Sequence, residues 1–289
     1  MPEDKKPFPP VSLVVIAVLF WSTGGMFIKL ATNLDAYQVT FFRSLLAGLT
    51  VLIITRKNGL RINGFGVIAS IIYATLLFLF VWATKHTTAA NAIFLQYTAP
   101  IYILVLAPFV IGEKFHIRDL ITVVFCIAGM SLFFVGDLTI GDYQGNIAAL
   151  GSGIFLGLYI MLLKHPKAAG MNSVITVIYG NFLLALLTLS SGIAALPTAT
   201  WRDYAAVGFL GIFQIGIAYI LFIKGVTGGT RPLDASIIGF IEPLLNPVWV
   251  FLFIGERPSN WAILGGSIII ATVIIHTLAQ YRVQKRSAV

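Results

Sequence analysis

The chain has 289 residues, of which 58% are hydrophobic and 10% are charged, and its formal net charge is +8. About a quarter of the residues of an ordinary soluble domain are charged, so this chain has too little polar surface to fold as a water-soluble protein. The composition therefore predicts a polytopic membrane protein with almost nothing outside the bilayer. The single Cys126 excludes an internal disulfide, and we expect it to be a small packing residue.

Ten apolar segments, most of them about as long as a bilayer is thick, follow one another along the chain. In hydrocarbon each must be a helix, because unpaired backbone groups are too costly there. The first segment lacks a clear small-x-small cleavage site and is expected to be retained. The predicted spans are roughly 11–31, 36–55, 64–84, 90–111, 118–136, 144–163, 172–195, 203–224, 234–254 and 261–280.

The basic residues indicate how these spans are oriented. Fourteen of the nineteen Lys and Arg residues lie on the predicted side of the N-terminus, three lie in the opposite loops, and Lys29 and Arg43 lie within spans. Loops rich in Lys and Arg stay in the cytoplasm, so both termini are predicted to be cytoplasmic, in a bacterial inner membrane. The net positive charge is then an orientation signal, and no nucleic-acid partner is expected.

The sequence also contains an internal repeat. Pro100 and Pro243 are 143 positions apart, and so are Glu113 and Glu256. Around these pairs, eight positions of the two copies are identical. Because chance matches are common in apolar sequence, the Pro and Gly-Glu matches carry most of the weight.

The repeat unit contains five spans, and copies of an odd unit enter the membrane from opposite sides. The predicted fold class is therefore an all-α polytopic membrane protein whose ten transmembrane helices form two inverted five-helix repeats. We expect the repeats at residues 1–138 and 139–289. Two inverted halves can exchange their packings, which gives alternating access to a central cavity.

Prolines and acids recur at equivalent places of the two copies. Pro100, Pro243 and Pro247 are predicted to act as hinges or to line the cavity, because proline removes a backbone hydrogen bond and weakens a helix locally. Static kinks are the alternative. Glu113 and Glu256 end their spans beside basic residues on opposite sides, so they are predicted to be structural gate or cap groups.

The repeated stretches carry a resemblance to a known family. TTAANAIFLQYTAPIYILVLAPFVIGEK (87–114) and IGFIEPLLNPVWVFLFIGER (238–257) resemble the EamA-type signature of the drug/metabolite transporter superfamily. This resemblance covers nearly the whole chain and implies a ten-helix exporter of small metabolites. It also implies that helices one, three, four, six, eight and nine surround the cavity. Within the family the chain looks most like bacterial amino-acid exporters, especially those for aromatic amino acids.

Glu242 is the most informative single residue. It lies about eight residues into the ninth span, roughly 12 Å deep. A carboxylate at that depth costs several kcal/mol unless it is paired, hydrated or protonated. The matching residue in the first half is Ala99, so the fold itself does not require an acid there. We predict that Glu242 meets a substrate ammonium or a proton; a paired structural acid is the alternative.

Other polar and aromatic residues near mid-depth complete the predicted substrate site. Arg43, about seven residues into the second span, is expected to be structural, either reaching outward or pairing across helices. A largely apolar and aromatic cavity with a few polar groups suits a small ligand. The candidates on the cavity helices are Trp21, Ser22, Tyr73, Gln96, Tyr97, Tyr102, Tyr159, Gln214, Tyr219 and Asn246.

Several classes of function are disfavoured. The chain lacks the G-x-x-x-x-G-K-[S/T] phosphate loop, and its four histidines lack metal-ligand spacing, so neither a nucleotide nor a metal cofactor is expected. Phosphorylated cargo would need several Lys or Arg deep in the cavity helices. One acid among aromatic rings suits a neutral amino acid or an organic cation. We therefore expect an exporter of small, amino-acid-like metabolites. A multidrug or organic-cation exporter and a membrane-embedded enzyme are the alternatives. The sequence does not specify the energy source or the oligomeric state.

Overall fold

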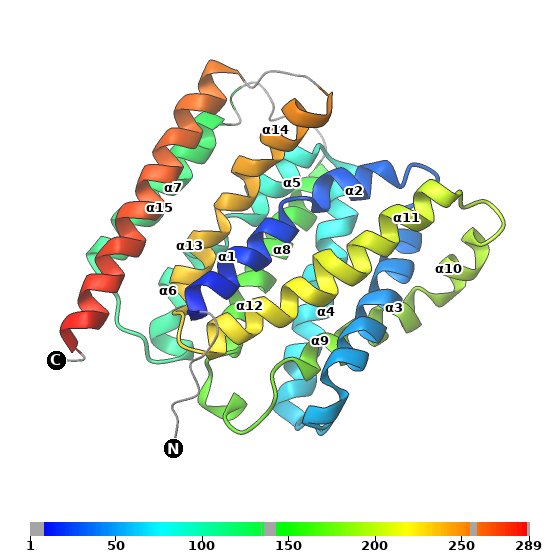
Figure 1. Cartoon of the computed structure of the whole chain (residues 1–289), viewed down its shortest axis with the longest axis horizontal. Coiled ribbons are helices and arrows are strands. Elements are labelled where there is room, and N and C mark those ends of the chain that lie inside the picture. Colours follow the sequence, from blue (N-terminus) through cyan, green and yellow to red (C-terminus); the bar gives the residue numbers. More distant parts are fainter. Residues whose placement is uncertain (1–8, 134, 136–142, 255–258, 288–289) are drawn as a thin grey trace.

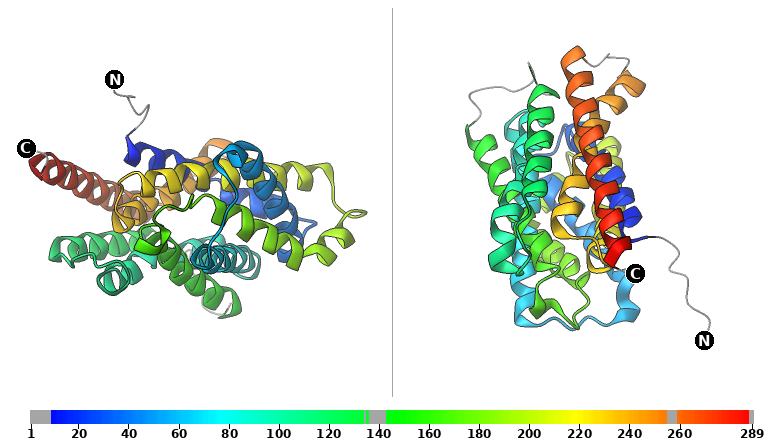
Figure 2. Two further views of the ribbon diagram at one scale, coloured as in Figure 1. Left: turned by 90° about the horizontal axis from the view of Figure 1, so that it is seen from below. Right: turned by 90° about the vertical axis from the view of Figure 1, so that its left-hand side faces the viewer.

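The structure is a computed structural model that describes residues 9–133, 135, 143–254 and 259–287 (Figures 1 and 2). The described chain is helical throughout and contains no strand. Glu256 and the expected boundary between the repeats, at residues 138 and 139, lie outside the described residues.

Each of the ten predicted spans is occupied by helix. The first half contains α1 (Pro10–Trp21), α2 (Gly24–Leu30), α3 (Ala36–Thr55), α4 (Gly64–His86), α5 (Ala89–Gln96), α6 (Ala99–Val110) and α7 (Ile117–Phe133). The second contains α8 (Tyr143–Leu162), α9 (Ile175–Leu187), α10 (Leu189–Ala195), α11 (Trp201–Phe209), η3 (Leu210–Ile217), α12 (Ala218–Thr227), α13 (Pro232–Gly239), α14 (Ile241–Ile254) and α15 (Asn260–Ser287). Short 3₁₀ turns follow α3 and α8, at Arg56–Asn58 and Pro166–Ala168.

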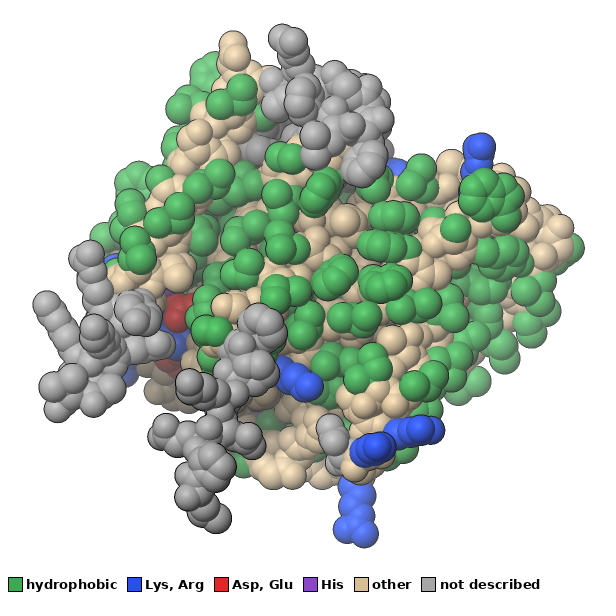
Figure 3. Space-filling model, in the orientation of Figure 1, with side chains coloured by type: hydrophobic (Ala, Val, Ile, Leu, Met, Phe, Trp, Pro, Cys, Tyr) green, Lys and Arg blue, Asp and Glu red, His purple; other side chains and the backbone are tan. Residues whose placement is uncertain are grey.

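Length and composition support a membrane location. Among the described helices, seven are long and apolar enough to cross a bilayer, and α9 with α10, bent by 65°, would be an eighth. The other two predicted spans are α7, which has 17 residues, and the broken pair α13–α14. Figure 3 shows apolar side chains over the face of the bundle, with most of the visible Lys and Arg toward its lower edge. We call the side on which α1 begins and α15 ends the terminal side (Figure 1).

Short polar side chains fix where several helices begin. Asp35 accepts a hydrogen bond from the Gln38 N–H at the start of α3, and Thr200 caps α11 in the same way. Such caps satisfy N–H groups that have no partner inside the helix.

The two halves pack as related copies. The first span of each half lies against the third span of the other, so α1 contacts α12 and α8 contacts α4. The second, fourth and fifth spans each contact their own equivalents, as α3 with α9, α6 with α13 and α7 with α15. The pair α7–α15 stands side by side in both figures. This reciprocal pattern is what a pseudo-twofold axis between the halves produces.

Equivalent helices also run in opposite directions. Along α3 and the seventh span (α9 and α10), Gly48 lies against Phe182, whereas the earlier residue Phe41 lies against the later Gly192. Along α7 and α15, the pairs Thr122–His276 and Gly129–Ile269 show the same reversal. Equivalent helices of parallel copies would not be reversed. The predicted fold class, two inverted five-helix repeats, is thus confirmed.

Helix breaks occur at equivalent points of the fourth spans. The break between α5 and α6 includes Tyr97, and the break between α13 and α14 is at Phe240, which is 143 positions later. Pro100 is the second residue of α6 and Pro243 the third of α14. Proline is tolerated in a first helical turn, where an N–H would lack a partner anyway. Their role as hinges stays a prediction, and the side chain of Pro247 lies outside the described residues.

Candidate functional site

A small central pocket lies between the two halves, where broken helices meet. The first span is interrupted at Ser22 and Thr23, between α1 and α2, and the eighth span contains η3, a π-helical turn. Such irregular helices in transporters line cavities near the middle of the membrane. About 30 Å³ is open to the centres of water-sized molecules, which is room for one or two waters. An amino acid would fit only after the surrounding helices move apart.

Glu242 supplies a carboxylate to this pocket. Its side chain is 6% exposed and accepts a hydrogen bond of 2.6 Å from the Tyr97 hydroxyl. Tyr97 comes from the fourth span of one half and Glu242 from the fourth span of the other. Among the described residues, no Lys or Arg forms an ion pair with Glu242. The carboxylate is therefore buried with a hydroxyl partner but without a counter-charge in contact.

Arg43 supplies a positive charge to the same pocket. It lies on α3, is fully buried, and donates from Nη2 to the Leu77 carbonyl oxygen at 3.2 Å. Its Nε and Nη1 have no hydrogen-bond partner within the described chain. Arg43 was predicted to be structural, yet a buried arginine within a span is as costly as a buried carboxylate.

Unpartnered polar atoms gather around the pocket. Besides Arg43, the pocket-lining residues Trp21 and Gln214 each have one, the indole Nε1 and the amide Oε1. Buried polar groups are normally hydrogen-bonded, and each exception needs an explanation. Donors and acceptors without partners around one pocket are the arrangement expected for binding a polar molecule.

Gln214 reaches the pocket because of two local features. It lies on η3, and π-helical turns are frequent at functional sites. Its amide occupies the space beside Gly24, where an added Cβ would lie 2.7 Å from Nε2. A side chain at position 24 would therefore displace the amide.

Aromatic rings form one wall of the pocket and the layer behind it. Trp21 packs on Tyr219 with ring centroids 4.8 Å apart, and both line the pocket. Behind them, Tyr73 lies 4.9 Å from Tyr219 and 5.0 Å from Tyr159. The Tyr73 hydroxyl accepts a hydrogen bond from Asn181. This second layer supports the ring of Tyr219 rather than lining the pocket.

The structure brings together six of the predicted substrate residues around the pocket: Trp21, Gln96, Tyr97, Gln214, Tyr219 and Glu242. It places others elsewhere. Ser22 accepts a hydrogen bond of 3.0 Å from the Trp249 indole, and Tyr102 packs beside Gly157 of α8. The side chain of Asn246 lies outside the described residues.

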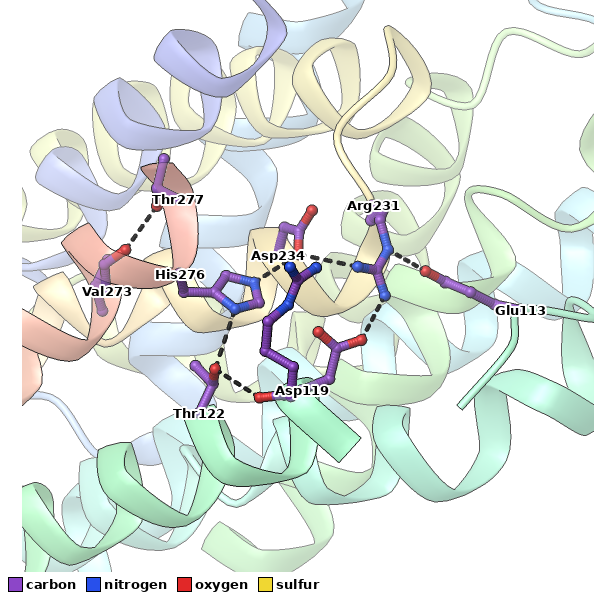
Figure 4. A network of polar contacts seen from close by, with 9 residues as sticks. Glu113, Asp119, Thr122, Arg231, Asp234, Val273, His276 and Thr277 are labelled. Atoms are coloured by element: carbon purple, nitrogen blue, oxygen red, sulfur yellow. Dashed lines mark hydrogen bonds and ion pairs between the residues drawn. The ribbon is translucent and has the colours of Figure 1, made fainter. Parts of the chain in front are cut away.

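A second polar cluster lies on the terminal side, where Glu113 was predicted as a gate (Figure 4). Arg231, just before α13, bonds to Glu113 at the end of the first half's fourth span and to Asp119 on α7, the latter at 2.8 Å. Asp234 and His276 continue this cluster. Burial lowers the pKa of Arg231, but the bond to Asp119 and the charges of Asp234 and Glu113 outweigh it, so that pKa lies above its ordinary value. The ion pairs join the two halves.

No metal site is evident within the described ranges, where no three His, Cys, Asp or Glu side chains are grouped closely enough to hold an ion. The polar groups of the central pocket can instead bind a small molecule with both charges. A carboxylate and a hydroxyl are available for an ammonium, and guanidinium N–H groups for an anion.

Inverted halves, broken helices and a central pocket define the class of secondary transporters. The model of the EamA-like transporter family matches this chain twice, at residues 9–135 and 143–278. The chain therefore belongs to the EamA-like transporter family, within the drug/metabolite transporter superfamily.

Several relatives with transporter names align with most of this chain. An uncharacterized transporter of Archaeoglobus fulgidus is 27% identical over 93% of this chain and 98% of that protein. The pseudopaline exporter CntI of Pseudomonas aeruginosa is 23% identical over 91% and 94%. Solute carrier family 35 member G1 of Homo sapiens is 22% identical over 94% and 80%. A solved crystal structure with 18% identity shares the fold, with a TM-score of 0.79 over 93% of this chain and 97% of the other.

Proposed function

We propose that this transporter exports small amino-acid-like metabolites, neutral or aromatic, across the bacterial inner membrane by alternating access. Both termini are then cytoplasmic, as the distribution of basic residues predicts. Residues 1–138 and 139–289 are the two moving halves. The pocket between them opens to one side and then to the other as the halves exchange packings.

The observation that carries the proposal is that the central pocket contains one acidic and one basic side chain. Glu242 and Arg43 both line it, and neither has an ion-pair partner within the described chain. An α-amino acid carries an ammonium and a carboxylate and complements both. Its side chain would then rest on the rings of Trp21 and Tyr219. Since the pocket now has room only for water, cargo binding needs a wider conformation.

Counterflow in proteoliposomes tests this function. Vesicles loaded with phenylalanine or tryptophan should accumulate the labelled amino acid when wild-type protein is present. Truncating one partner of a buried charged contact costs about 2–5 kcal/mol, so Glu242→Gln and Arg43→Gln should each weaken cargo binding at least about tenfold. Arg202→Gln is the matched control, because Arg202 lies exposed beside the Trp201 ring. Equal counterflow in all four proteins would reject the site.

An organic-cation or multidrug exporter is the second candidate, because a single buried acid with aromatic walls also suits a cation. The two candidates differ in their need for Arg43. With a cation as cargo, Glu242→Gln should abolish flux while Arg43→Gln should preserve it. With an amino acid, both substitutions should impair it. Product formation without flux would instead indicate a membrane-embedded enzyme.

A further inference from the structure

The cluster on the terminal side contains a histidine that the central pocket does not use. His276 on α15 is 3% exposed, and both of its ring nitrogens have partners. Nε2 lies 2.8 Å from Asp234 Oδ1 on α13, and Nδ1 lies 3.1 Å from Thr122 Oγ1 on α7 (Figure 4). The histidine thus joins one helix of the first half to two helices of the second.

We propose that Thr122, Asp234 and His276 form a proton-binding site, separate from the substrate pocket, whose occupancy controls the ion pairs of Arg231 between the two halves. This inference rests on the proposed transport function and adds the ion to which transport responds.

Hydrogen-bond counting shows how the site holds a proton. The Thr122 hydroxyl has one hydrogen, and it lies 2.9 Å from the Arg118 carbonyl oxygen, to which it can donate. When it does so, His276 Nδ1 must donate to Thr122, and the bond between Nε2 and Asp234 needs a second hydrogen, on either Nε2 or Oδ1. The ring and the carboxylate then share one extra proton.

Rotating the hydroxyl gives the unloaded state. Thr122 then donates to Nδ1, and a neutral His276 donates only from Nε2 to Asp234. The imidazole keeps both hydrogen bonds in either state. The proton can therefore bind and leave while both ring nitrogens stay hydrogen-bonded. A histidine whose neighbours could not rotate would have both hydrogen bonds in only one protonation state.

Charged groups surround the site. Three carboxylates, those of Glu113, Asp119 and Asp234, contact the guanidinium of Arg231. The charged and titratable groups on the neighbouring elements are Asp119 and Cys126 on α7, Asp234 on α13, Arg231 before it, Glu113 after α6, Glu242 on α14, and the exposed Lys114, Arg118 and Lys224.

A cavity connects the pair to the terminal side. It measures about 650 Å³ and lies between the start of α1, the loop before α13 and residues 276–280 of α15. Asp234 and His276 line it, together with Thr230 and Gln280, which each present a buried polar atom without a partner in the described chain. A cavity of this size with unpartnered polar atoms in its wall can hold water, which carries protons.

Asp234 links proton binding to the ion pairs. Its Oδ1 is the atom bonded to His276, and the same atom lies 3.7 Å from Arg231 Nη1. When His276 is charged, Asp234 attracts Arg231 less, and the guanidinium stays with Glu113 and Asp119 of the first half. Loss of the proton strengthens the attraction of Arg231 to Asp234 and weakens the connection between the halves.

The repeat supplies an internal comparison. Residues 143 positions earlier than Arg231 and Asp234 are Thr88 and Asn91, on the opposite side of the bundle. There Asn91 donates a hydrogen bond of 2.9 Å to Asn146. An uncharged amide therefore takes the place of the Asp234 carboxylate in the other half.

Counterflow at equal pH on both sides of the vesicle, varied from about pH 5 to 8, tests the inference. Wild-type flux should change several-fold across this range, and His276→Gln should give a flat profile while retaining counterflow. Thr122→Val should lower the midpoint of the profile by about one pH unit. The substitution removes a charged hydrogen bond from the loaded site but only a neutral one from the unloaded site, so it disfavours the loaded state. The control is His116→Gln, an exposed histidine on the same side, which should keep the wild-type profile.

The outcomes separate the two proposals. Absence of wild-type counterflow at every pH contradicts the proposed function. Wild-type counterflow that does not vary with pH, or an unchanged profile in both His276→Gln and Thr122→Val, overturns the proton site and leaves the function intact. If His276→Gln fails to fold, the midpoint shift of Thr122→Val decides.

Discussion

Replacing Arg43 by methionine should stabilise the protein and remove its cargo response. Arg43 is fully buried, and two of its donor nitrogens have no partner in the described chain. Each unpaired buried donor costs about 1–3 kcal/mol, and the remaining bond to Leu77 contributes about 1.5–3 kcal/mol. The difference favours an apolar side chain of similar length by about 1–3 kcal/mol, consistent with replacements of other buried charges.

Thermal unfolding of detergent-purified protein measures this difference. At roughly 2–4 °C per kcal/mol, Arg43→Met should melt about 5 °C above wild type. Cargo at 100 times its Kd should stabilise wild type by about 2.7 kcal/mol and leave Arg43→Met unchanged. Arg202→Met serves as the surface control. A lower melting temperature together with normal cargo stabilisation would show that Arg43 is a structural residue.

Three further predictions follow from single contacts. Tyr97→Phe removes the 2.6 Å bond to Glu242 and should change the amino-acid concentration that half-saturates counterflow, without unfolding the protein; an unchanged concentration would mean that this bond does not position the acid for cargo. Gly145→Val should lower the melting temperature by several degrees, because an added Cβ would lie 2.7 Å from the His86 backbone. Gly208→Val is the control and should not lower it, because an added Cβ there has nothing within 4 Å; equal effects would contradict the α4–α8 packing. A fluorescent protein fused after Val289 should mature in the cytoplasm, and export of that end would reverse the proposed orientation.

The fold was largely predictable because its signals are local and strong. Each span is a long apolar run, and the repeated Pro and Gly-Glu residues gave the 143-residue register that the breaks at Tyr97 and Phe240 reproduce. The pocket was predictable in part. Glu242 stood out by its depth and by Ala99 at the matching position. Arg43, at a similar depth, was predicted to be structural, and its place in the pocket lining became visible only in the structure.

What sequence reasoning missed depends on helix rotation and on contacts between distant segments. Tyr73 and Tyr159 lie at the right depth but one layer behind the pocket, and Tyr102 faces α8. Depth alone does not distinguish these positions. The His276–Asp234 contact joins residues 42 positions apart on separate helices, and the sequence was searched for histidines only at metal-ligand spacing.

The second half carries Glu242 where the first half carries Ala99, so the two copies contribute a single acid at this position. If the two halves were separate identical subunits, every residue on the axis would occur twice. Two carboxylates would then face each other across the centre and repel. Joining both copies in one polypeptide lets each diverge, so that a symmetric scaffold can offer a single negative charge to an asymmetric molecule.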